Sequence, residues 1–199
     1  MLALVLQYQP HGAFLNFRGI PVLSAHNSIL SRNGVSGNPG AAHRDLALFN
    51  LAIDSKLRGC DLVALRVKDL GDSGHILSRA IVMQQKTKRP VQFEMTEGTR
   101  QALLDWIRNR TLRSEDYIFP SRARPGGHLS TRQYGRIVHR WVDQIGLDGH
   151  AYGTHTMRRT KASLIYRRTK NLRAVQLLTG TQQAREYREI PGHRGRRCP

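Results

Sequence analysis

After Asp45, apolar residues recur at helical spacing, and one strand-like stretch interrupts this pattern. The first helical block covers residues 45–58 and contains neither glycine nor proline. Its apolar residues are Leu46, Phe49, Leu51, Ile53 and Leu57. They predict a buried helix that ends near Arg58–Gly59, with Gly59 just past its end and Asp61 as the cap of a short following helix.

The strand-like stretch covers residues 76–95, where two apolar runs flank the polar turn TKRP (87–90). Two strands joined by a basic hairpin turn explain this pattern. Four further helical blocks follow, with Thr96 and Ser130 as N-caps of the first two: Thr96–Arg108, Ser130–Gly146, Thr154–Arg168 and Leu172–Leu178. The sequence therefore predicts a fold that is mainly α with a small antiparallel β-sheet (α+β).

The two ends of the chain differ from this body. Residues 1–44 contain no Asp or Glu and show no sustained apolar period. We expect them to form a poorly ordered N-terminal segment, residues 45–180 to form the folded domain, and residues 181–199 to be a basic, disordered tail.

Charge limits the classes of partner. The chain has 32 Lys and Arg against 14 Asp and Glu, hence a net charge of +18 and a pI near 11.2. This excess disfavours an ordinary metabolic enzyme and indicates a polyanionic partner, most often nucleic acid. No apolar run reaches the roughly 18 residues of a membrane span. We therefore expect no membrane partner. Cys60 and Cys198 lie far apart and form neither a metal motif nor a disulfide framework, which favours a reducing, cytoplasmic setting.

Four residues in three distant segments are candidates for chemistry. Taken singly, Arg58 could complement a helix dipole, Lys86 could be a solvated turn charge, and His155 and Arg158 could belong to a basic helix face. Together they suit phosphodiester chemistry: guanidiniums bind the non-bridging oxygens, and Lys or His transfers protons. No acidic cluster for Mg²⁺ is evident, so we expect neither a metal nor a cofactor.

At these residues the chain resembles the tyrosine recombinase (phage integrase) family. The resemblance spans roughly Asp45–Gly180 and rests on four ordered segments: LAIDSKLRGCDLVAL (51–65), QQKTKRPVQF (84–93), THTMRRTKAS (154–163) and NLRAVQLL (171–178). It implies a recombinase catalytic domain in which Arg58 and Arg158 bind the scissile phosphate. It further implies Lys86 as general acid in the minor groove and His155 as general acid/base. The implied partners are double-stranded DNA and other protomers, with no small-molecule substrate.

The resemblance breaks after Leu178, where the family continues with leucine-glycine-histidine and a nucleophilic tyrosine. Here Thr179-Gly180-Thr181 follows, and the nucleophile's place falls near Ile190. Tyr187, the one tyrosine of the tail, is a possible nucleophile, although it lies three residues short of that place. Residues 179–199 can be encoded by a DNA sequence that, after deletion of its first base, is translated differently. This second translation contains the family's glycine-histidine and, nine positions after the histidine, a tyrosine. We therefore hypothesise a single-base insertion near Leu178–Thr179.

Three functions remain open. The first is a DNA recombinase that forms a 3′-phosphotyrosyl link. The second is a DNA-binding remnant that no longer recombines, in which further basic residues contact DNA: Lys56, Lys88, Arg132, Arg159 and Lys161. The third is a basic RNA-binding protein, which the lack of an aromatic stacking strip disfavours.

Overall fold

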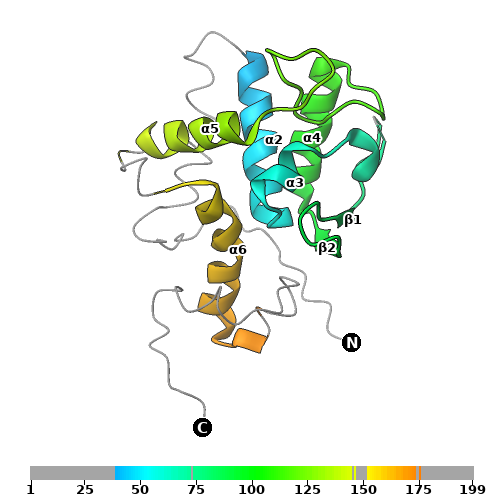
Figure 1. Ribbon diagram of the computed structural model, residues 1–199. Helices are drawn as coiled ribbons and strands as arrows, with labels where there is room; N and C mark the ends of the chain where they lie inside the picture. Colours follow the sequence, from blue (N-terminus) through cyan, green and yellow to red (C-terminus); the bar gives the residue numbers. More distant parts are fainter. Residues whose placement is uncertain (1–38, 73, 145, 147–151, 174, 176–199) are drawn as a thin grey trace.

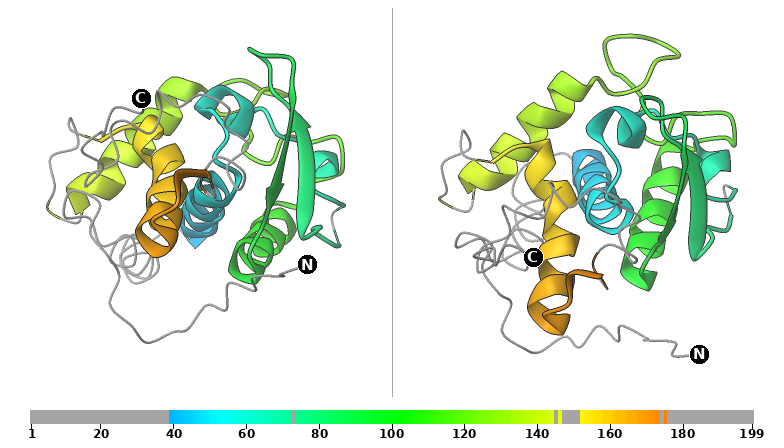
Figure 2. Two further views of the ribbon diagram at one scale, coloured as in Figure 1. Left: turned by 90° about the horizontal axis from the view of Figure 1, so that it is seen from below. Right: turned by 60° about the horizontal axis from the view of Figure 1, so that its bottom comes forward.

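A central helix organises the molecule. The computed structural model describes residues 39–72, 74–144, 146, 152–173 and 175. Helix α2 (Pro39–Ser55) lies between α4 (Glu97–Arg110) and α6 (Thr154–Thr169) and contacts both (Figure 1 and Figure 2). The short helix α3 (Gly59–Val63) and the 3-10 turn η1 (Val67–Asp69) follow α2 in the chain. Helix α5 (Thr131–Gln144) packs on α3 and α6.

The predicted hairpin is present. Strands β1 (Arg79–Met83) and β2 (Pro90–Glu94) pair antiparallel, with Arg79 opposite Glu94 and Met83 opposite Pro90. Ala80 and Phe93 face the core, whereas Ile81 on the outer face is 66% exposed. The fold class expected from the sequence, mainly α with a small antiparallel sheet, is confirmed.

The core forms where α2 and α4 pack together. Leu48 and Leu51 of α2 and Leu103 of α4 are fully buried. Trp106 of α4 is also buried, and its indole Nε1–H donates to the carbonyl of Ile118 at 2.6 Å. The segment after α4 folds back and so offers an acceptor for the buried indole.

The ends of α2 differ from the prediction. The helix begins at Pro39, six residues before Asp45, and proline suits a first helical turn because its missing N–H would be unpaired there anyway. It ends at Ser55, where the hydroxyl accepts the N–H of Leu57 at 3.4 Å and so competes with helical bonding.

Lys56, rather than Gly59, takes the left-handed backbone position after α2, with φ of 55°. Gly59 instead begins α3, and Asp61 lies within the first turn of α3 instead of capping it. The predictions for Gly59 and Asp61 were therefore wrong.

The two predicted N-caps are confirmed. The Thr96 hydroxyl accepts the N–H of Thr99 at 3.4 Å, and the Ser130 hydroxyl accepts the N–H of Gln133 at 3.1 Å. Residues 1–38 and 176–199 lie outside the described residues, and with them most of the predicted N-terminal segment and the whole predicted tail. The division into three segments stays a prediction.

Candidate functional site

Arg58 is held by a residue of the hairpin. It lies at the N-cap of α3 in extended backbone conformation, and its Nη1 donates to Oε1 of Gln84 at 3.0 Å. The hydroxyl of Thr87 donates to the same oxygen at 2.7 Å. Gln84 is only 8% exposed. These three residues, Arg58, Gln84 and Thr87, form the Gln84 cluster.

The turn that bears Lys86 is fixed from both sides. The N–H of Gln84 donates to the carbonyl of Arg89 at 3.0 Å, and the N–H of Lys88 donates to the carbonyl of Gln84 at 2.9 Å. From α3, a buried carboxylate oxygen of Asp61 accepts the N–H of Gln85 at 2.9 Å. The exposed Lys86 is therefore carried on a turn that is bonded to both ends of the Arg58–Asp61 segment.

Helix α6 brings the third segment to the same place. The Nε of Arg158 donates to the carbonyl of Lys56 at 2.9 Å, two residues before Arg58 in the chain. His155 is exposed one turn earlier, on the same face of the helix as Arg158. The structure thus connects the segments of Arg58, Lys86 and Arg158, which are far apart in sequence.

A close approach at Gly59 fixes α3 against α5 and α6. A Cβ atom at this position would lie 3.4 Å from the ring of Tyr134 and 3.8 Å from Cβ of Thr154. Tyr134 is buried, and burial raises the pKa of its hydroxyl well above the usual range. Although Tyr134 is next to the segment of Arg58, its hydroxyl stays protonated, and this disfavours it as a nucleophile.

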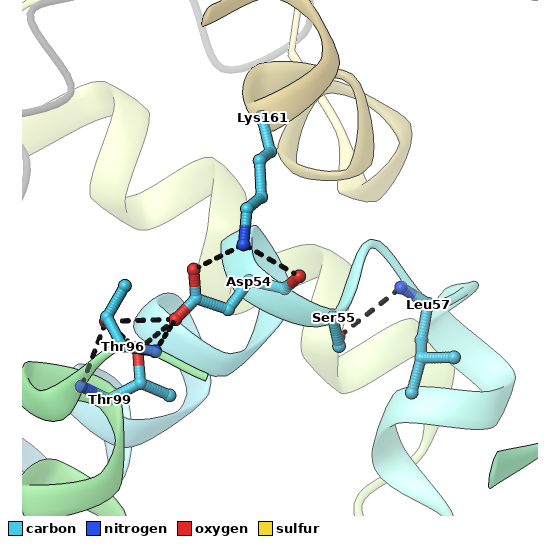
Figure 3. Close-up of polar contacts among 6 residues, drawn as sticks. All are labelled: Asp54, Ser55, Leu57, Thr96, Thr99 and Lys161. Carbon is cyan, nitrogen blue, oxygen red and sulfur yellow. Dashed lines mark hydrogen bonds and ion pairs between the residues drawn. The ribbon is translucent and has the colours of Figure 1, made fainter. Parts of the chain in front are cut away.

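A second polar cluster lies at the end of α2 (Figure 3). The Nζ of Lys161 contacts Oδ1 of Asp54 at 2.9 Å and the carbonyl of Asp54 at 3.3 Å. The other carboxylate oxygen accepts the N–H and hydroxyl of Thr96 at 2.9 and 3.0 Å and the hydroxyl of Thr99 at 2.6 Å. This Asp54 cluster (Asp54, Thr96, Thr99 and Lys161) joins α2, the start of α4, and α6.

The Asp54 carboxyl is ionised at neutral pH. Burial raises its pKa, but the charge of Lys161 and hydrogen bonds from Thr99, Thr96 and Lys161 outweigh burial, so that the pKa lies below its usual value of 3.8. Lys161 is therefore engaged in an internal ion pair.

Lys56 lies beside this cluster and is only 8% exposed. Burial and the neighbouring charge of Lys161 lower the pKa of Lys56 to about 8, against the opposing effect of Asp54. Neither Lys56 nor Lys161 has the open surface position that the predicted DNA contacts suggested.

The other three predicted DNA-contacting residues are more accessible. Lys88 and Arg132 are exposed, on the hairpin turn and at the start of α5, and Arg159 is half-buried on α6. Contact of any of the five with DNA stays a prediction.

The roles of Gln84 and Asp54 could not be predicted from the sequence. Gln84 looked like an ordinary polar residue beside a turn, and its link to Arg58 spans 26 positions. Asp54 gave a weak signal, since it is an acidic residue that directly follows the apolar residues 51–53 of the predicted buried helix. A carboxylate there needs a buried partner, but nothing local indicated Lys161.

Among the residues that the structure describes, no three His, Cys, Asp or Glu side chains gather as a metal site would require. None of the described helices is long and apolar enough to span a bilayer. Tyr187 and the proposed insertion point lie outside the described residues.

The fold matches that of known tyrosine recombinases. The model of the phage integrase family matches residues 31–187, and the chain belongs to this family. Among curated relatives, the "Probable integrase/recombinase YoeC" of Bacillus subtilis (strain 168) is 30% identical over 133 residues, which cover 67% of this chain and 68% of the relative. The tyrosine recombinase XerC of Neisseria gonorrhoeae (strain ATCC 700825 / FA 1090) is 29% identical over 146 residues, 73% of this chain but 46% of XerC.

Solved structures show the same fold at lower identity. The XerH site-specific recombinase bound to difH substrate superposes with a TM-score of 0.67 at 18% identity, over 86% of this chain and 48% of XerH. The Tn1549 transposon integrase in complex with transposon right end DNA superposes with a TM-score of 0.63 at 18% identity, over 88% of this chain and 60% of the integrase. The chain spans about half the length of XerC and XerH.

Proposed function

We propose that this chain is the catalytic domain of a site-specific DNA recombinase. In this proposal Arg58 and Arg158 bind the scissile phosphate, Lys86 is the general acid and His155 is a general acid/base. The observation that carries the proposal is the pair of bonds from Arg158 to the carbonyl of Lys56 and from Arg58 to Gln84, because they bring both arginines and the Lys86 turn to one region.

The proposed chemistry needs no metal or nucleotide. A tyrosine oxygen attacks the phosphorus, and the bond from phosphorus to the 5′-oxygen of the next nucleotide breaks. His155 takes the proton of the tyrosine, Lys86 gives a proton to the leaving 5′-oxygen, and the arginines stabilise charge on the non-bridging oxygens. The products are a 3′-phosphotyrosyl link and a free 5′-hydroxyl, and attack by another 5′-hydroxyl reverses the step. Because strand exchange needs several active sites, the proposal includes self-association on DNA, in the cytoplasm beside the chromosome.

Helix α5 offers a row of phosphate contacts. Arg132, Arg136 and Arg140 are exposed and recur every four residues, hence on one helix face over about 12 Å. A single-sign row of this kind suits the backbone of a duplex, and it supports double-stranded DNA as the partner. The relatives named above that were solved as complexes hold DNA, which supports the same choice.

The second candidate function is a DNA-binding remnant, and the spacing of the tail favours it. Tyr187 lies three residues before the place where the family has its nucleophile, so a phosphate held by Arg58 and Arg158 would meet no attacking hydroxyl. The chain would then bind DNA without cleaving it. The nucleotide sequence across the Leu178 codon tests the proposed insertion, since codons that cannot yield the restored ending would exclude it.

A covalent-adduct assay separates the two functions. The full chain is incubated with a pool of nicked duplexes of randomised sequence and denatured in SDS. An adduct that is lost in Tyr187→Phe and in Arg158→Lys would establish cleavage and exclude the remnant. DNA binding without an adduct would establish the remnant, and absence of DNA binding would contradict both.

A further inference from the structure

One amide oxygen lies between the arginine of the candidate site and the turn that carries its lysine. Oε1 of Gln84 accepts Nη1 of Arg58 at 3.0 Å and the hydroxyl of Thr87 at 2.7 Å. Gln84 is more than nine-tenths buried, and its backbone also closes the turn through Arg89 and Lys88. An amide oxygen has two lone pairs, and these two donors occupy them both.

We propose that Gln84 is a positioning residue of the recombinase site: it holds Arg58 in the orientation that binds the phosphate and fixes the Lys86 turn beside it. This inference rests on the proposed function. It adds a residue that acts through Arg58 and through the turn, without touching DNA itself.

The neutrality of Gln84 is the central point. A guanidinium has five N–H donors, and the bond to Gln84 uses one of them. Because the acceptor is uncharged, it orients the side chain and leaves the full positive charge of Arg58 for an anion. A carboxylate in the same place would orient Arg58 equally well but would compete with the phosphate for its charge.

Thr87 extends this effect to the turn. Thr87 follows Lys86 in the chain, and its hydroxyl donates to the same Gln84 oxygen that accepts from Arg58. A movement of the turn would therefore change the hydrogen bonding of the oxygen that holds Arg58. Preorganisation of this kind raises affinity because less side-chain freedom is lost when the anion binds.

The test is a titration of the full chain with inorganic phosphate, followed at the ¹H–¹⁵N signal of the Arg58 Nε–H group. The signal is assigned by its absence in Arg58→Lys. We expect Gln84→Glu, which keeps shape and acceptor but adds a negative charge, to raise the apparent Kd by about tenfold or more. Gln84→Met, which removes the acceptor, should raise it about threefold.

The matched control is Gln92→Glu. Gln92 is exposed on β2 of the same hairpin, opposite Ile81, and receives the same added charge. We expect its Kd to stay within about twofold of the unmodified chain, since an exposed charge is well screened. Equal Kd values for Gln84→Glu and Gln92→Glu would overturn the inference and leave the proposed function standing. If phosphate leaves the Arg58 signal of the unmodified chain unchanged, the proposed phosphate site itself is wrong.

Thr87 variants keep the inference testable if the Gln84 variants do not fold. Thr87→Val removes the hydroxyl at nearly constant shape and should raise the Kd about twofold to threefold, together with faster amide exchange at residues 86–88. Thr87→Ser keeps the hydroxyl and should restore both values. Identical Kd values and exchange rates in the Val and Ser variants would contradict the role of the shared oxygen.

Discussion

The Asp54 cluster and the Gln84 cluster lie at the two ends of one short segment, yet they treat positive charge in opposite ways. In the Asp54 cluster, Lys161 meets a buried carboxylate and is neutralised within the protein. In the Gln84 cluster, Arg58 meets a neutral amide oxygen. A cation paired with an internal anion contributes to the structure, whereas a cation oriented by a neutral group can still attract an external anion. The comparison suggests that Lys161 stabilises the fold and that Arg58 serves the site.

The largest effect should come from breaking the Asp54 cluster. Asp54→Ala leaves the half-buried Lys161 without its carboxylate and removes the acceptor of two threonine hydroxyls. We expect the free energy of unfolding to fall by about 3–5 kcal/mol, measured by urea denaturation. Asp105→Asn on α4 is the control: its half-buried carboxylate accepts one hydrogen bond from Gln101, and the change should stay within about 1 kcal/mol. Equal losses in both variants would show that the cluster has no special structural role.

The pH dependence of stability should reveal Lys56. Its pKa is about 8 in the folded chain against 10.5 in the unfolded one, so the unfolded chain binds more protons between these values. Stability should therefore rise as the pH increases from 8 to 10.5, by about 3 kcal/mol at most. Lys56→Met lacks the titrating amine, so its stability should not show this rise. The difference between the stability–pH curves of the variant and the unmodified chain measures the contribution of Lys56. Parallel curves would contradict the low pKa.

At acid pH, Asp54 rather than Lys56 should govern how the stability depends on pH. The pKa of Asp54 is depressed in the folded chain, so its stabilising effect is present above the usual value of 3.8 and is lost as the pH falls through the lower, folded-state pKa. We expect Asp54→Asn to weaken the loss of stability below about pH 4. Urea midpoints measured between neutral and acid pH give the two slopes, and an unchanged acid slope would contradict the assignment.

Arg58→Ala should affect DNA affinity more than stability, whereas Asp54→Ala should affect mainly stability. Arg58→Ala removes one half-buried hydrogen bond, so the free energy of unfolding should fall by about 1 kcal/mol. Affinity for a short DNA duplex should fall about tenfold, measured by fluorescence anisotropy. Arg110→Ala removes the same charge at the far end of α4 and should affect binding much less. A large loss of stability without loss of affinity would place Arg58 among the structural cations.

The smallest effect should come from the exposed row of α5. Replacing Arg136 and Arg140 together by alanine should leave stability unchanged within about 0.5 kcal/mol. The slope of log affinity against log salt should decrease by about 2, because two fewer phosphates are neutralised. An unchanged slope would remove α5 from the proposed DNA surface.

Much of the fold could be predicted because its signals are local. The hairpin follows from two apolar runs around a polar turn, and the caps at Thr96 and Ser130 follow from residue type beside helical spacing. Arg58, Lys86, His155 and Arg158 were selected by type and order, and the structure connects the segments of three of them.

The rest depends on pairings that local spacing does not encode. Lys161 and Asp54 are 107 positions apart, so the sequence could not tell an internal ion pair from a surface lysine. The end of α2 depends on a hydroxyl of Ser55 and on a left-handed lysine, where glycine is the usual residue. Gln84 gained importance only when its oxygen was seen between Arg58 and Thr87.

The contact of Gly59 with Tyr134 and Thr154 ties the start of α3 to helices α5 and α6. A methyl group at this position would lie 3.4 Å from the ring of Tyr134 and 3.8 Å from Cβ of Thr154, which is ordinary van der Waals contact, so alanine should fit without displacing α3. Because Arg58 immediately precedes this position in the chain, a change in how α5 or α6 packs against Gly59 would also shift the arginine.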